Sequence, residues 1–391
     1  MPDDMYMNSF KQEIKMKQTQ LAYINGLKGI GAGMVYLCHF VFAFYYGMYS
    51  LEAADCHLPG NLDIAMGQSP LNILFSGNFA VRLFLVMSGY VLCLGYFKTR
   101  DKDRLVKSAK KRYPRLLPPI LITNVLICLL MLAGAYRNVP VAELTGSAWL
   151  AGFNRCEPSL LKAVWEAVFG CFFLGTNQFN GVLWTIPYLF LGALLVYGTA
   201  WLLGDKKWRY VVYVVLGAAL FLTDYAGVFL GFVLCDVVHT QEKLVGWLKK
   251  QKVLLWAVFF LGFYLSSYPS AGAHLEGTIY GIIPIVMVIP FHLAGALMMV
   301  AAVVLLEPLQ KFFGVRPFVW LGEISYSFYL VHFPVIATAG CGLFEVLYGK
   351  MSYGLATMLV FIVTTVLTVG ISMMSKKFIE PLGEKLCGIK R

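Results

Sequence analysis

The stretch KGIGAGMVYLCHF (residues 28–40) places a histidine inside a run of residues that otherwise suits lipid. Lys28 and His39 are eleven positions apart, which is about 16 Å along a helix and about half the hydrocarbon depth of a bilayer. A titratable group at that depth is costly unless it lines a cavity or has a partner, so His39 is a candidate functional residue. The alternative is a hydrogen bond between two helices, which polar residues often make in helix bundles.

A second group of candidates lies in the basic segment 98–115, KTRDKDRLVKSAKKRYPR, which has nine basic residues and two acids. Such runs usually orient the chain and contact lipid headgroups. Arg112 and Arg115 differ from the rest because they lie three residues apart and directly precede an apolar run. Two guanidinium groups in that position can bind phosphate oxygens bidentately, which favours a phosphate-rich cytosolic ligand.

Two further apolar runs carry polar or aromatic residues that could belong to a site. Arg82 and Ser88 lie in GNFAVRLFLVMSGYV; Arg82 either has a function or extends to the interface, and the Ser88-Gly89 step favours close helix packing. Trp184, in GVLWTIPYLF, either belongs to the interfacial aromatic belt or lines a site.

The segment WLGEISYSFYLVHFP carries a polar stripe. Ser325, Tyr329 and His332 recur at helical spacing and are expected to share a face. His332 lies about 21 Å from the inner start of this run, a depth comparable to that of His39.

The composition predicts the elements that must position these residues. The 391 residues are 59% hydrophobic and 14% charged, and the mean hydropathy is +0.70, whereas soluble domains carry about 25% charged residues. Runs of about twenty apolar residues recur along the chain and predict an all-α, polytopic membrane protein. We expect ten spans: 22–47, 73–97, 116–134, 182–203, 209–222, 225–238, 254–268, 278–306, 318–341 and 353–375.

The basic residues predict the orientation of these spans. With the amino terminus inside, 27 of the 32 Lys and Arg residues fall in cytoplasmic segments. This positive-inside pattern places both termini in the cytoplasm and, with the net charge of +11 spread over short loops, argues against nucleic acid as a partner. We expect one domain, 1–391, with a polar segment 1–21 in place of a cleaved signal peptide and a basic tail 376–391.

Cysteine and histidine spacing gives no sign of a metal site. The nine cysteines form no CxxC pair, and the six histidines show no ligand spacing, so we expect no bound metal. Cys56 and Cys156 both fall in predicted outer segments, which leaves a disulfide between them as an alternative to two free thiols.

Five of these stretches, in this order, resemble the membrane-bound acyltransferase-3 family of O-acyltransferases. The family patterns LDGLRGIAA…HF and FFVLSGY read here INGLKGIGAGMVYLCHF and LFLVMSGY, and its Arg-x-x-Arg pattern reads Arg112-Tyr-Pro-Arg115. Its LWT-x-P and LG-x-ISYS-x-YLVH-x-P patterns read LWTIP and LGEISYSFYLVHFP. The resemblance covers the first third of the chain, then 181–197 and 316–334.

The resemblance implies transfer of an acyl group, by default acetyl, from cytosolic acyl-CoA to a hydroxyl of a cell-surface glycan or related acceptor at the plasma membrane. His39 would be the general base, with an acyl-histidine intermediate as the alternative. Acyl-CoA would be a substrate, not a bound cofactor. Its phosphates would be held by Lys28, Arg112 and Arg115. The residues implied to shape the cavity or acceptor site are Arg82, Ser88, Trp184, Ser325, Tyr329 and His332.

Three positions depart from the family pattern. Asn25 replaces an aspartate and Lys28 replaces an arginine, although a lysine cannot reproduce a forked guanidinium. Near Tyr188 the family usually has a glutamate, and here Leu189 follows with no acid nearby.

Two other functions compete with this one. A secondary transporter would be expected to show an internal repeat and mid-span acids, whereas only Asp236 and Glu323 fall in the predicted spans, both near the inner ends. A catalytically lapsed homologue that acts as a binding subunit is favoured by the missing glutamate and opposed by His39 and the arginine pair.

Overall fold

The computed structural model describes residues 2–270, 275–282 and 288–388, with side chains from residue 22 onward. About 81% of the chain is helix, and the described residues contain no strand, which confirms the all-α prediction. The chain is a membrane protein with seven helical stretches that are long and apolar enough to cross a bilayer.

These seven stretches are built from the long helices of the chain. They are α1 (Pro2–Phe44, apolar from Ala22), α4 (Gly77–Leu92) with α5 (Leu94–Thr99), α6 (Lys102–Leu132), η5 (Gly181–Thr185) with α10 (Ile186–Leu203), α15 (Val288–Leu305), α17 (Arg316–Val335) with η6 (Ile336–Gly340) and α18 (Cys341–Leu347), and α19 (Tyr353–Phe378) with α20 (Glu380–Leu386).

The three other predicted spans correspond to shorter apolar helices: α11 (Arg209–Leu220), α12 (Tyr225–Thr240) and α14 (Lys252–Ser266). The chain turns at Thr223-Asp224 between α11 and α12, where the predicted spans 209–222 and 225–238 meet. The count of ten spans and the orientation of the termini stay predictions.

Short helices connect the long ones. They are α2 (Gly47–Ser50), η1 (Ala53–Asp55), η2 (Pro59–Asn61), α3 (Leu62–Gly67), η3 (Pro70–Phe75), α7 (Asn138–Thr145), α8 (Ala148–Ala151), α9 (Leu160–Trp165), η4 (Glu166–Leu174), α13 (Glu242–Lys250) and α16 (Glu307–Phe313).

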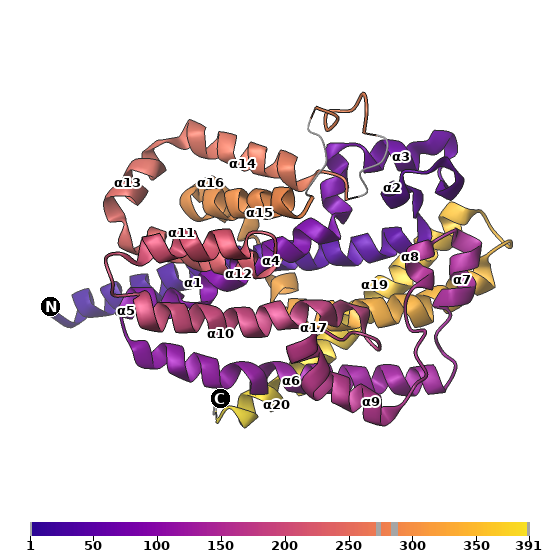
Figure 1. Ribbon diagram of the computed structural model, residues 1–391, viewed down its shortest axis with the longest axis horizontal. Helices are drawn as coiled ribbons and strands as arrows, with labels where there is room; N and C mark the ends of the chain where they lie inside the picture. The colour runs from indigo at the N-terminus through magenta and orange to yellow at the C-terminus, as the bar shows by residue number, and fades with distance from the viewer. Residues whose placement is uncertain (1, 271–274, 283–287, 389–391) are drawn as a thin grey trace.

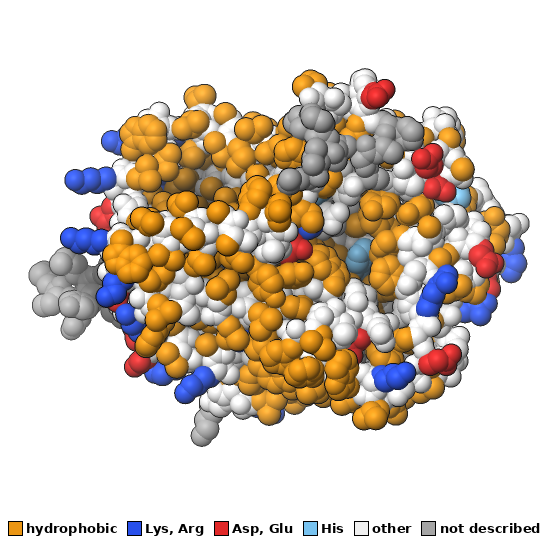
Figure 2. All heavy atoms as spheres, viewed as in Figure 1, with side chains coloured by type: hydrophobic (Ala, Val, Ile, Leu, Met, Phe, Trp, Pro, Cys, Tyr) orange, Lys and Arg blue, Asp and Glu red, His pale blue; other side chains and the backbone are white. Residues whose placement is uncertain are grey.

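The long helices run roughly along the longest axis of the molecule, as Figure 1 shows. The start of α1, α5 and α13 lie at the left end, whereas α2, α3, α7 and α8 lie at the right end. Segments predicted to be cytoplasmic therefore gather opposite segments predicted to be outer. Figure 2 shows hydrophobic side chains over the middle of this face and Lys and Arg side chains toward its two ends. This distribution suits a protein whose middle faces lipid.

Two predicted boundaries are wrong. The basic segment 98–115 is mostly helix, because α6 begins at Lys102 and runs through the basic residues into the apolar span. The predicted span 278–306 has no helix at 278–282, which are turns and bends, and α15 begins at Val288. Pro284 lies outside the described residues, and Pro290 lies in the first turn of α15, where proline is tolerated. The described part of the segment contains a single helix, α15.

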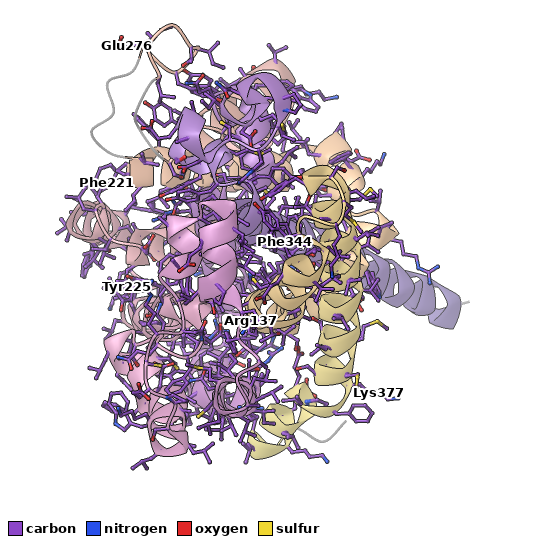
Figure 3. All side chains as sticks on the ribbon, turned by 90° about the vertical axis from the view of Figure 1, so that its right-hand side faces the viewer. Arg137, Phe221, Tyr225, Glu276, Phe344 and Lys377 are labelled. Atoms are coloured by element: carbon purple, nitrogen blue, oxygen red, sulfur yellow. The ribbon has the colours of Figure 1, made fainter. Side chains whose placement is uncertain are left out.

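A bidentate ion pair joins the connecting helices at the right end. Arg137, just before α7, contacts Glu345 of α18 at 2.7 and 2.5 Å, and its backbone N–H donates to the Ala337 carbonyl. Figure 3, viewed from that end, shows Arg137 and Phe344 near each other in the middle of the face. Cys56 and Cys156 are both free thiols, so the alternative of a disulfide between them is not realised.

Glycine allows the backbones of α1 and α17 to approach closely. A Cβ at Gly322 would lie far inside contact distance of the Asn25 carbonyl, and a Cβ at Gly29 would meet the Phe318 carbonyl. The GLKG stretch thus serves packing, because only glycine fits where two helix backbones touch.

We expect Gly322→Ala to destabilise the protein by about 1–3 kcal/mol, since rigid backbone on α1 must move to admit the methyl group. Thermal unfolding in detergent measures the effect. Gly370→Ala on α19 is the matched control, because no atom lies within 4 Å of the added Cβ there. An equal loss of stability in both variants would contradict the packing argument.

Candidate active site

The two intramembrane histidines form a direct pair. His39 on α1 and His332 on α17 are 293 residues apart in sequence, yet His39 Nδ1 lies 2.7 Å from His332 Nε2. Their ring planes are nearly parallel, at 19° to each other, with centroids 4.9 Å apart. His332 is fully buried, whereas His39 is partly exposed. The close crossing of α1 and α17 is what brings the two rings together.

A backbone carbonyl sets the protonation pattern of this pair. His332 Nδ1 lies 3.1 Å from the Phe328 carbonyl oxygen, which can only accept, so His332 carries its proton on Nδ1 when neutral. His332 Nε2 is then an acceptor for the N–H at His39 Nδ1. Neutral His39 is consequently left with its lone pair on Nε2, the nitrogen that a general base uses.

Aromatic side chains enclose the pair. Trp149 of α8 lies with its ring centroid 4.9 Å from that of His39, and Phe333 lies 5.8 Å away. The Tyr329 ring centroid is 5.9 Å from that of His332, and its hydroxyl donates to the Val182 carbonyl at 2.9 Å.

A cation cluster lies toward the predicted inner end. Lys28 of α1 and Arg112 and Arg115 of α6 are close enough to interact electrostatically. Lys28 and Arg112 are half-buried and Arg115 is exposed. Within the described part of the chain, no carboxylate forms an ion pair with any of the three. Three like charges without such partners favour an anionic ligand.

The Arg112 guanidinium binds the backbone where the family pattern has an acid. Its Nε and Nη2 donate to the Leu189 carbonyl oxygen at 3.3 and 3.1 Å. The carbonyl orients the guanidinium but neutralises none of its charge. Because leucine stands where the family pattern has glutamate, the Arg112 guanidinium is held in place here but no carboxylate at this position balances its charge.

One face of α17 connects the cation cluster with the histidine pair. Tyr326 donates its hydroxyl to the Leu116 carbonyl at 2.9 Å and interacts electrostatically with Arg112 and Arg115. Tyr329 and His332 follow at intervals of three residues, so the three side chains share a face that rises about 9 Å. An elongated ligand held by the cations would extend along this face toward His39.

The other residues singled out in the sequence lie apart from these two groups. Arg82 is buried, with its Nη2 3.0 Å from Asp224 and its Nη1 donating to the Asn78 carbonyl. Trp184 lies near Tyr188, which interacts electrostatically with Arg82. The remaining two form no hydrogen bond with either group within the described part of the chain.

Those two are the serines. Ser88 is half-buried on α4 beside Gly89, where the backbone of α4 meets that of α12, as the sequence predicted for a packing point. Ser325 donates to the Gly322 carbonyl of its own helix at 2.8 Å. Its spacing from Tyr329 and His332 places it on the same face of α17, as predicted from the i, i+4, i+7 pattern.

Two participants were not predicted from sequence. Trp149 lies in the segment 135–181, whose mixed polar and apolar composition is typical of a segment at the membrane surface. Nothing in the local sequence therefore indicates that Trp149 is a neighbour of His39. The Leu189 carbonyl carries no side-chain signal at all. Only the position of the missing glutamate pointed to that place in the chain.

The fold and the site define a helical membrane protein with two groups of functional residues, an intramembrane histidine pair and a cation cluster. One face of α17 connects the two groups. The acyltransferase-3 family model, described as an acyltransferase domain, matches residues 21–376. The match covers nearly the whole chain, and the chain belongs to this family of membrane acyltransferases. No curated protein and no solved structure matches the chain significantly.

Proposed function

We propose that this membrane acyltransferase is an O-acyltransferase that takes an acyl group, by default acetyl, from cytosolic acyl-CoA. The acceptor is a hydroxyl of a cell-surface glycan or a related molecule, and the plasma membrane is the proposed location. The observation that carries the proposal is the bonded histidine pair, because its protonation pattern leaves His39 Nε2 free to accept a proton.

In the proposed reaction His39 Nε2 removes the proton from the acceptor hydroxyl as the hydroxyl oxygen attacks the thioester carbon. The carbon–sulfur bond then breaks, and the leaving thiolate takes the proton back from His39. The products are the acyl ester and free coenzyme A. His332 acts on this step as a positioning residue, since it orients His39 and accepts its Nδ1–H. Attack by His39 itself, through an acyl-histidine, is the alternative sequence.

The donor side of the proposal rests on the cation cluster. The diphosphate of coenzyme A carries negative charge on closely spaced oxygens, which suits Lys28, Arg112 and Arg115. The face of α17 that links this cluster to His332 supports entry of the donor from the predicted inner end. A glycan acceptor would then approach from the other end, where α7 and α8 lie.

Labelled acetyl-CoA tests the proposal. Membranes that contain the native protein are expected to transfer label to surface glycans above the level of membranes without it. Binding of acetyl-CoA to the purified protein is the second readout, and Arg112→Gln is expected to weaken it about 10- to 100-fold. Arg155→Gln is the matched control, because Arg155 also donates to a backbone carbonyl but lies in a predicted outer segment.

The outcomes separate the candidate functions. Binding without transfer would favour a different acceptor or a lapsed homologue that acts as a binding subunit. Absence of acetyl-CoA binding would contradict the proposed donor and return the transporter to consideration.

A further inference from the structure

A pocket of about 360 Å³ lies between α5 and the first turns of α6, next to the cation cluster but separate from it. Three cations and a hydroxyl surround it: Arg104, Lys107, Ser108 and Lys111, all on α6. Its apolar part includes the buried side chain of Leu105. The volume falls within the range of about 300–1,000 Å³ typical of small-molecule sites.

The spacing of these residues places their charges on one helix face. Positions 104, 107, 108 and 111 follow the i, i+3, i+4, i+7 pattern, so the three cations are neighbours. Like charges at this spacing destabilise a helix, and the arrangement is more favourable when an anion lies between them.

Two carboxylates near the pocket are already paired, one of them with a pocket cation. Asp101 lies 3.4 Å from Arg104. Asp205 contacts Lys102 at 2.8 Å and accepts from the Tyr96 hydroxyl at 2.8 Å, and these hydrogen bonds lower the pKa of Asp205. Lys107 and Lys111 form no ion pair with any described carboxylate. The pocket therefore presents net positive charge.

The cation cluster follows the pocket along α6, about one helical turn further on. Ser108 precedes Arg112 by one turn, and Lys111 precedes Arg115 by one turn. Ser108 hydrogen-bonds the Tyr197 hydroxyl, which in turn interacts electrostatically with both arginines. Arg104 and Arg115 are about 16 Å apart along the helix axis. The stretch of α6 from Arg104 to Arg115 thus offers two adjacent positions for anionic groups of one ligand.

Coenzyme A carries phosphate in two places, a diphosphate and a 3′-phosphomonoester on its ribose. We propose that the pocket around Lys107 and Lys111 binds the 3′-phosphate of acyl-CoA while the diphosphate lies at Arg112 and Arg115. This inference rests on the proposed function, in which acyl-CoA is the donor. A phosphomonoester has a charge of about −1.5 to −2 and three acceptor oxygens, which matches three cations and a serine hydroxyl. The pocket then makes the enzyme selective for acyl-CoA over the same donor without its 3′-phosphate.

The test compares acetyl-CoA with 3′-dephospho-acetyl-CoA as ligands of the full-length protein in nanodiscs of phosphatidylcholine. The native protein is expected to bind acetyl-CoA about 10- to 100-fold more tightly than the dephospho form. The double variant Lys107→Gln, Lys111→Gln is expected to bind both equally, with unchanged affinity for the dephospho form. That unchanged affinity also shows that the variant is folded.

A charge-matched control removes two exposed cations away from the pocket. The double variant Lys243→Gln, Lys250→Gln, both exposed on α13, is expected to keep the native preference for acetyl-CoA. Loss of the preference in this control would overturn the proposal, because it would attribute selectivity to overall charge.

Two further outcomes would overturn the proposal in distinguishable ways. Equal binding of the two compounds by the native protein would overturn the 3′-phosphate site while leaving acetyl-CoA as the donor. If neither compound binds, the proposed function itself fails. In nanodiscs that contain a phosphoinositide, lipid binding that depends on Lys107 and Lys111, without donor selectivity, would assign the pocket to a lipid headgroup instead.

Discussion

Replacing His39 by alanine is expected to reduce acyl transfer by about 10²–10⁴-fold while acetyl-CoA binding stays unchanged. The reduction follows from loss of the general base, which typically contributes that factor. Binding is retained because the cation cluster lies about 16 Å from His39 along α1. Transfer from labelled acetyl-CoA, with membranes adjusted to equal amounts of protein, measures the effect. Equal transfer by both proteins would contradict the proposed mechanism.

Variants of His332 distinguish a positioning role from a purely structural one. His332→Phe keeps an aromatic ring beside Phe328 and Tyr36 but removes the acceptor for His39 Nδ1–H. It is expected to lower kcat with little change in KM. His332→Gln supplies a side-chain oxygen that can accept this hydrogen bond, so we expect it to recover part of kcat. If both variants lower kcat equally and unfold at the native temperature, the hydrogen bond does not position His39.

The largest loss of stability is expected from Asp236→Ala. Asp236 is fully buried on α12, and its two carboxylate oxygens lie 2.6 and 3.0 Å from Nε and Nη2 of Arg209 on α11. The Thr240 hydroxyl donates to the same carboxylate at 3.0 Å. Removing the carboxylate leaves a nearly buried guanidinium without its counter-charge, which costs about 3–5 kcal/mol. Thermal unfolding of the purified protein in detergent measures the loss.

Two comparisons make this prediction specific. Replacing both partners, Arg209→Met with Asp236→Leu, is expected to recover most of the lost stability, because no unpaired charge remains. Glu307→Ala breaks an ion pair with Lys311 in which both side chains are about three-quarters exposed, and it is expected to leave Tm unchanged. If Asp236→Ala unfolds at the native temperature, the Arg209–Asp236 pair does not stabilise the fold.

Much of the architecture could be predicted from the sequence because apolar runs and basic loops are local features. Each predicted span overlaps a helix, and the family follows from short motifs whose order is visible in the chain. The errors lie where local composition is ambiguous. The basic stretch before Arg112 reads as a loop by its charge but continues the helix of the following span, since Lys and Arg are good helix formers.

The candidate site shows the limit of sequence reasoning more sharply. The sequence marked His39 and His332 separately, from the cost of a titratable group in lipid, and it marked Arg112 from its place beside an apolar run. It did not predict that the two histidines bond to each other. It also did not predict that the Leu189 carbonyl orients Arg112.

By itself, therefore, the sequence determined the membrane class, the family and most of the individual residues that could do chemistry. Only the tertiary structure decided which of them meet: His39 with His332, Arg82 with Asp224, and Arg209 with Asp236. The physical reason is that hydropathy and spacing are properties of one segment. Contact between helices depends on how they rotate and cross. For α1 and α17, which carry His39 and His332, the close approach at Gly29 and Gly322 determines both the rotation and the crossing.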